Sequence, residues 1–208
     1  MTHWLYTRHA SFWFVTLVLY QNTLSIFEKN EMFSYILPIA VTYAVMSISE
    51  WFLHAKLMHD PRTRMGKFHI AHHQEVNNDM TLRMKKNDPY LSDAEWRGTG
   101  FSWRMIRRLM PLVIIMGAIG HLVFGTVSLV LVFLLFAYTV LVWNAVHPFM
   151  HGLSQPPFSY GPSLPLLIPD VWRNYLVSHH TKHHTYGGTR NFNVTLPGAD
   201  VLFGSVAP

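Results

Sequence analysis

Histidines gather in four short stretches of this chain. The sequence holds 14 histidines among 208 residues, and the four stretches read HAKLMH, HIAHH, HPFMH and HHTKHH. Their histidines are His54, His59, His69, His72, His73, His147, His151, His179, His180, His183 and His184. Neutral imidazole binds iron, copper, nickel and zinc, whereas magnesium and calcium prefer oxygen ligands. The residue type therefore indicates a transition-metal site.

The spacing within each stretch predicts which imidazoles lie close together. Residues three and four apart share one face of an α-helix, and HIAHH and the end of HHTKHH both have the pattern HxxHH. His54 and His59 are five apart and diverge on an ideal helix, so they could serve two metals, or one metal if the helix frays at its end. Ten imidazoles are too many for one metal. They suit two ions at about five nitrogens each.

Four other histidines need a separate interpretation. His3 and His9 are terminal and His121 is isolated in an apolar segment, so none of the three is expected to be a ligand. His179 precedes the last HxxHH pattern. It is expected either to contact a ligand from behind or to act as an occasional ligand.

Apolar segments of membrane-spanning length frame these stretches. Half of the residues are hydrophobic and only 13% are charged. The apolar segments are 10–27, 32–54, 111–125 and 127–146. Since a span needs about 20 residues, they predict an all-α, integral-membrane four-helix bundle made of two helical hairpins. We expect one domain over residues 1–208, and a signal peptide at 10–27 is the less favoured alternative because no cleavage motif follows.

The charge distribution predicts the orientation of the bundle. Ten Lys or Arg residues lie in 60–108, beside the apolar segments, so the net charge of +5 points to a membrane surface and not to nucleic acid. By the positive-inside rule this loop and the tail after 147 face the cytoplasm. All four histidine stretches then lie on that side, just beyond the helix ends. The absence of cysteine excludes disulfides and thiolate metal sites.

The four stretches resemble the histidine boxes of the fatty acid hydroxylase and sterol desaturase superfamily, whose members are integral-membrane di-iron enzymes. The tail NFNVTLPGADVLFGS is similar to the family's ending, although Ala199-Asp200 stands where the family often has Trp-Asp. The resemblance covers about residues 45–205. It implies a four-helix membrane bundle with a cytosolic histidine-rich helical cap over two iron ions. The ligands it implies are His54, His59, His69, His72, His73, His147, His151, His180, His183 and His184.

The activity implied by this resemblance is O2-dependent hydroxylation of an unactivated C–H bond of a lipid, with a fatty acyl, sphingolipid or sterol-like substrate. Carotenoid hydroxylases have similar boxes, but their third box is one residue longer than HPFMH and they lack this tail. Desaturation on the same scaffold also stays open. A membrane metal transporter is the main alternative from another class, but it would place ligands near the membrane midplane. A haem protein would need a partner for His121.

The implied partners are a lipid and an electron donor. The chain has no cytochrome b5-like domain, so a separate ferredoxin or cytochrome b5-type protein with its reductase is expected to deliver electrons. The membrane is either a bacterial inner membrane or the endoplasmic reticulum. Zinc is expected to replace iron readily in the purified protein. Trp51, Trp143 and Phe149 are candidates to line the substrate's route from the bilayer, or else belong to an interfacial aromatic belt.

An all-histidine site leaves metal charge uncompensated, because neutral imidazoles cancel none of it. Carboxylates behind the ligands are therefore expected to supply negative charge and to orient imidazole N–H groups. The candidates are Glu50, Asp60, Glu75 and Asp200. Asn144, one turn before His147, is a further candidate to bind a ligand or a water molecule.

Overall fold

The computed structural model describes residues 31–81, 100–153, 156, 158–162 and 168–208. The chain divides into two compact units, residues 1–41 and 42–208, and every described histidine belongs to the second unit. The expected span at 10–27 lies outside the described residues, as do His3 and His9.

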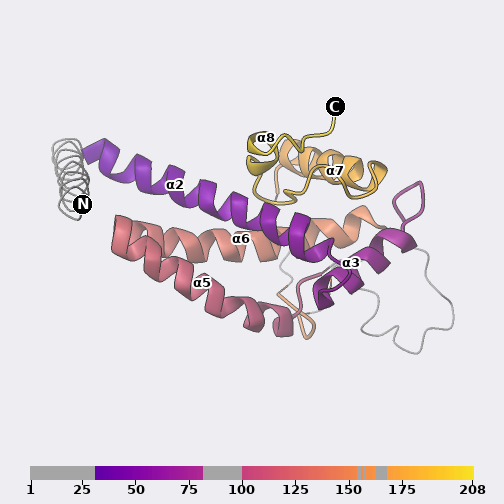
Figure 1. Ribbon diagram of the computed structural model, residues 1–208, viewed down its shortest axis with the longest axis horizontal. Coiled ribbons are helices and arrows are strands. Elements are labelled where there is room, and N and C mark those ends of the chain that lie inside the picture. The colour runs from indigo at the N-terminus through magenta and orange to yellow at the C-terminus, as the bar shows by residue number, and fades with distance from the viewer. Residues whose placement is uncertain (1–30, 82–99, 154–155, 157, 163–167) are drawn as a thin grey trace, which may run out of the picture. The chain divides into compact units, whose positions relative to one another are not determined.

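The described secondary structure is helical, with no strand (Figure 1). The helices are α2 (Glu31–Phe52), the π-helix η1 (Leu53–Met58), α3 (Arg64–Glu75), α5 (Trp103–Phe124), α6 (Thr126–Met150), α7 (Asp170–Thr185) and the short α8 (Ala199–Leu202). The expected all-α class is confirmed for this part of the chain.

Three helical segments are long and apolar enough to cross a membrane. They are Ser34–Met58, Trp103–Phe124 and Thr126–Met150. Large apolar side chains on these segments remain exposed, among them Leu122, Ile119 and Leu134. Such exposed apolar surface suits contact with lipid, so the structure supports association with a membrane. The fourth span and the complete four-helix bundle stay predictions.

A tight turn joins α5 to α6. Gly125 adopts a φ of 76°, and its N–H donates to the carbonyl of His121 at 2.8 Å. Glycine suits this left-handed backbone because it has no Cβ. The turn lies where the sequence predicts it.

Helix α5 begins earlier than the apolar pattern indicates. Ser102 caps it, with the side-chain oxygen accepting from the N–H of Met105 at 3.3 Å, and Pro111 lies inside the helix. Arg104, Arg107 and Arg108 were expected in the polar loop, but they lie in the first turns of α5. The serine cap satisfies an N–H group that would otherwise lack a partner, which allows the helix to start there.

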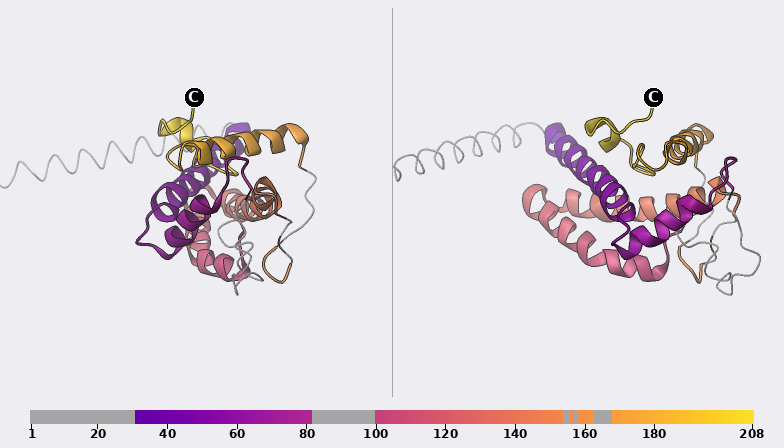
Figure 2. Two further views of the ribbon diagram at one scale, coloured as in Figure 1. Left: turned by 90° about the vertical axis from the view of Figure 1, so that its right-hand side faces the viewer. Right: turned by 45° about the vertical axis from the view of Figure 1, so that its right-hand side comes forward.

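The long helices and the C-terminal tail share a core. One buried cluster contains Met58, Phe101, Val140, Trp143 and Val194. A second joins α6 to α7 through Val146, Met150 and Leu176. Within the unit 42–208, α3 and α7 lie toward the end of the α5–α6 hairpin that is away from its turn (Figures 1 and 2). This end carries the histidines.

Candidate metal centre

Ten histidines form two groups of five, each with the geometry of a possible metal site. Within each group, one ring nitrogen of every residue lies within 4.8 Å of the others. Site 1 comprises His54, His59, His69, His73 and His183, and site 2 comprises His72, His147, His151, His180 and His184. The two groups contain all ten expected ligands. His179 belongs to neither.

The HxxHH patterns divide between the two sites. On α3, His69 and His73 are four apart and belong to site 1, whereas His72 belongs to site 2. Helix α7 reverses this arrangement, since the first and last histidines of its pattern belong to site 2 and His183 to site 1. Each helix thus provides a pair to one site and a single imidazole to the other.

The π-helix explains how His54 and His59 join the same site. On an α-helix, residues five apart point about 140° away from each other. Hydrogen bonding from i to i+5 in a π-helix brings such residues toward one side, and η1 covers Leu53–Met58, with His59 as its C-cap. Both imidazoles belong to site 1, which fits the alternative in which the two histidines serve one metal.

Nitrogen atoms converge in site 1 at the spacing of metal ligands. The Nε2 atom of His69 lies 2.9 Å from Nε2 of His54, 3.2 Å from that of His59 and 3.1 Å from that of His73. His183 Nε2 lies 3.0 Å from Nε2 of His73 and 3.3 Å from that of His59. Metal–nitrogen bonds of about 2.0–2.1 Å place neighbouring ligand atoms about 2.9–3.4 Å apart.

These contacts cannot all be hydrogen bonds. A neutral imidazole has one N–H. His54 Nδ1 lies 2.5 Å from the carbonyl oxygen of Phe192, and His183 Nδ1 lies 2.6 Å from that of Arg190. A carbonyl only accepts, so both protons are on Nδ1 and the Nε2 lone pairs face the other imidazoles. Converging lone pairs repel one another unless a cation lies between them.

In site 2, too, ring nitrogens converge at the spacing of metal ligands. His180 Nε2 lies 2.8 Å from Nε2 of His147 and 3.0 Å from that of His184. His151 Nδ1 donates to the carbonyl of Met80 at 2.8 Å, and its buried Nε2 has no hydrogen-bond partner in the described structure. Both ring nitrogens of His72 are also buried without such a partner. Because buried polar atoms are normally satisfied, these orphaned nitrogens fit a bound metal.

Burial keeps the imidazoles neutral. Desolvation lowers the pKa of His59 and His151 from 6.5 to about 4. The same effect lowers the pKa of His183 to about 3 and that of His73 to about 2. At neutral pH these side chains therefore offer lone pairs to a metal, as metal binding requires.

Glu50 does not contact the histidines. Its carboxylate accepts from the N–H of Thr195 at 2.9 Å, the hydroxyl of Thr195 at 2.7 Å and the N–H of Leu196 at 2.8 Å. The expected hydrogen bond from Glu50 to an imidazole is not among its described contacts, because Thr195 and the N–H of Leu196 occupy its oxygens. Glu50 instead anchors the tail that carries Phe192, the partner of His54.

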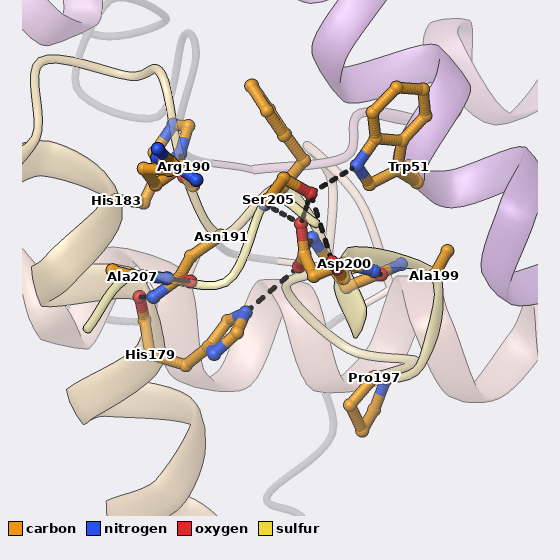
Figure 3. A network of polar contacts seen from close by, with 12 residues as sticks. Trp51, His179, His183, Arg190, Asn191, Pro197, Ala199, Asp200, Ser205 and Ala207 are labelled. Atoms are coloured by element: carbon orange, nitrogen blue, oxygen red, sulfur yellow. Dashed lines mark hydrogen bonds and ion pairs between the residues drawn. The ribbon is translucent and has the colours of Figure 1, made fainter. Parts of the chain in front are cut away.

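Asp200 also acts through the tail, as Figure 3 shows. Its carboxylate accepts from the N–H groups of Phe192 and Asn193, each at 2.8 Å, and from the Ser205 hydroxyl at 2.6 Å. His179 Nε2 lies 3.1 Å from the same carboxylate. His179 thus contacts Asp200 and takes no part in either group of five. The carboxylate fixes the loop whose carbonyls orient the imidazoles of site 1.

The described hydrogen bonds of the Asn144 side chain go to backbone groups and not to an imidazole. Its amide accepts from the N–H of Phe101 at 2.6 Å and donates to the carbonyls of Phe101 at 3.1 Å and Pro162 at 2.9 Å. The expectation of a ligand contact is wrong for this residue, because backbone partners occupy the amide. Asp60 pairs with the exposed Arg62, and Glu75 makes no hydrogen bond to a histidine among the described contacts.

The three candidate substrate residues lie in different surroundings. The Trp143 ring is buried, with its centroid 4.6 Å from that of His147 and 6.2 Å from that of His54. Trp51 Nε1 donates to the Ser205 hydroxyl at 2.9 Å, so this residue joins the tail anchor, the hydrogen-bonded group of Trp51, Asp200 and Ser205. Phe149 is 64% exposed. Of the three, only Trp143 lines a described cavity.

Two neighbouring cavities with a shared apolar wall lead to site 1. A cavity of about 540 Å³ reaches His69, and a neighbouring one of about 70 Å³ reaches His54. The two share the lining residues Met58, Met65, Phe101, Met105, Leu109 and Trp143. The sequence analysis missed these methionines, and their signal is weak because methionine is equally at home in an ordinary core.

Comparisons with known proteins yield no relative. The chain matches no family model, no curated protein and no solved structure among those compared. The histidine clusters could hold metal ions by their geometry alone. Together with the three apolar helices, they describe a membrane-associated protein with a possible metal centre.

Proposed function

We propose that this protein is a membrane-bound di-iron oxygenase that hydroxylates an unactivated C–H bond of a lipid, using O2 and electrons from a separate donor. The observation that carries the proposal is a partly apolar cavity that reaches one of two adjoining groups of five neutral histidines. The resemblance of the four stretches to known histidine boxes gives further support, and three candidate spans suit a substrate that comes from the bilayer.

The overall reaction defines what the protein must receive. One oxygen atom of O2 enters the C–H bond and the other leaves as water, so each turnover consumes two electrons and two protons. Bound iron supplies the redox chemistry that amino-acid side chains lack. A ferredoxin or a cytochrome b5-type protein with its reductase would supply the electrons.

Tail carbonyls prepare the imidazoles for metal binding. The carbonyls of Phe192 and Arg190 fix the Nδ1 protons of His54 and His183. This contact sets the tautomer, directs the Nε2 lone pair into site 1 and raises its basicity. In site 2 the carbonyl of Met80 does the same for His151.

The cavity lining would position the lipid. Met58, Phe101, Leu109 and Trp143 form an apolar wall that favours a hydrocarbon chain and disfavours water. His69 and His54 lie along the same lining. A C–H bond of a bound chain would therefore be held near site 1, away from bulk solvent.

Lipid mass spectrometry under ¹⁸O₂ tests the function. Cells that express the protein with a suitable electron donor should accumulate a lipid carrying one ¹⁸O atom. The variants His183→Ala and His72→Ala should abolish the product, while the matched control His121→Ala should retain it. A product that has lost two hydrogens without gaining ¹⁸O would identify a desaturase. Normal turnover in the His183 variant would contradict the proposal.

A further inference from the structure

The larger cavity is unusually rich in arginine. Arg64 of α3 and Arg104, Arg107 and Arg108 of α5 all line it, and all four are exposed. None of the described lining residues is Asp or Glu. The same cavity reaches His69 of site 1.

These arginines have no acidic partner in the described part of the chain. The ion pairs found there are Asp60–Arg62, Asp170–Arg173 and His179–Asp200, all of them elsewhere. Arg104, Arg107 and Arg108 are spaced i, i+3 and i+4, so they share one face of α5 and repel one another. An anion bound among them would relieve this repulsion.

Most of the other lining side chains are apolar, although Ser102, Ser159 and Tyr160 also border the larger cavity. Met58, Met65, Met105, Leu109 and Trp143 continue into the neighbouring small cavity, which reaches His54. That cavity has no arginine in its lining, and its one acidic residue, Glu50, is hydrogen-bonded to the tail. The connected lining is therefore cationic in one part and apolar in the other. This pattern complements a molecule with an anionic head and a hydrocarbon chain.

We propose that the cavity binds a single-chain amphiphile with an anionic head group, a phosphate or a carboxylate. Guanidinium groups bind both head groups through paired N–H donors, so the four arginines hold the head. The chain lies along the apolar lining beside His69 and His54. Taking this amphiphile as the substrate rests on the proposed oxygenase function, whereas its binding does not.

A binding assay with three probes tests the proposal. The metal-loaded full chain is placed in phosphatidylcholine nanodiscs, which contain no anionic lipid. Hexadecyl phosphate and hexadecanoate should each compete with a chain-end photoreactive hexadecyl phosphate for labelling, and hexadecanol should compete at least tenfold more weakly. The label should map to cavity residues such as Met58, Met65 or Trp143. Labelling confined to the exposed Ile115 and Ile119, which do not line the cavity, would mean contact with bulk lipid only and would overturn the proposal.

Matched variants isolate the arginines. The double variant Arg104→Gln/Arg108→Gln should weaken both anionic probes at least tenfold and leave hexadecanol unchanged. Lys67→Gln and Arg173→Gln remove exposed positive charges that do not line the cavity, so they should have no effect. The pair Arg104→Lys/Arg108→Lys should recover part of the lost affinity. Equal binding by the double Gln variant and the unchanged protein would overturn the proposal.

Two results separate this proposal from the oxygenase function. Arginine-dependent binding of the anionic probes without any lipid oxidation would support the binding site and contradict the enzyme. Oxidation of a lipid at the same rate in the double Gln variant, with no preference for anionic probes, would support the enzyme and contradict the binding site.

Discussion

Site 1 and site 2 have the same five-imidazole composition but different surroundings. Site 1 borders the cavities through His69 and His54, and tail carbonyls orient two of its rings. No histidine of site 2 lines a described cavity, and four of its five are at most 2% exposed. Ligand type sets which metals bind, whereas the neighbouring residues set which metal a substrate can approach. We infer that site 1 faces the substrate.

The largest expected effect is common to both sites. His69→Ala and His180→Ala should each lower turnover by more than about a hundredfold, because losing a ligand should cost more than losing a contact behind it. Turnover is measured as ¹⁸O incorporation into lipid, with His121→Ala as the control. Substantial activity in the His180 variant would show that site 2 is dispensable and would break the comparison.

The next effect should separate the two sites. Asp200→Asn weakens the hydrogen bonds that hold Phe192 and Asn193, so the carbonyl that orients His54 loses its position. Metal affinity at site 1 should fall about 10–100-fold, while site 2 should keep its affinity. Titration of the metal-loaded protein against a chelator measures the metal affinity of each site. Asp170→Asn, at an exposed acid that pairs with Arg173, is the control. Equal weakening of both sites would contradict the separate role of the tail.

A pH effect should involve both sites. The pKa of His183 is lowered to about 3 and that of His151 to about 4, so the unfolded chain takes up protons first as pH falls below about 6.5. Stability is therefore fully present above that pH and is lost progressively toward pH 4 and below. Thermal unfolding of the metal-free protein at pH 7.5 and pH 5 should show a lower midpoint at pH 5. An unchanged midpoint would contradict the burial of neutral imidazoles.

The smallest effect concerns the tail anchor. Trp51→Phe removes the N–H that donates to Ser205, itself a partner of Asp200. The loss should cost about 0.5–1.5 kcal/mol of unfolding free energy, the usual net contribution of one hydrogen bond. Denaturant unfolding in detergent measures it, with the exposed Phe149→Leu as the control. An unchanged free energy of unfolding in the Trp51 variant would contradict the contribution of this hydrogen bond.

Residue type and spacing predicted much of the candidate site. The ten histidines are the ones that converge, and the three described apolar segments are helical, although α5 begins before its apolar segment. Both results follow from local rules, since helical periodicity and the length of a span are visible in the sequence. The assignment of each imidazole to a site is not local. It depends on how α3 and α7 are rotated about their axes, which the HxxHH pattern leaves open.

The groups that orient the imidazoles could not be predicted from the sequence. They are backbone carbonyls of Met80, Arg190 and Phe192, and every residue has such a group. Glu50 and Asp200 were expected to orient the imidazoles of the metal ligands, but backbone N–H groups of the tail bind their oxygens, and the imidazole that Asp200 does contact is that of His179. The π-helical turn at His54 could not be predicted either, because no residue type requires a π-helix.

Metal stoichiometry of the purified chain tests the central claim most directly. Elemental analysis against protein mass should find two iron or zinc ions per chain, and His69→Ala and His180→Ala should each reduce the value to about one. Zero or one ion in the unchanged protein, or two ions in both variants, would contradict the account of two adjoining sites.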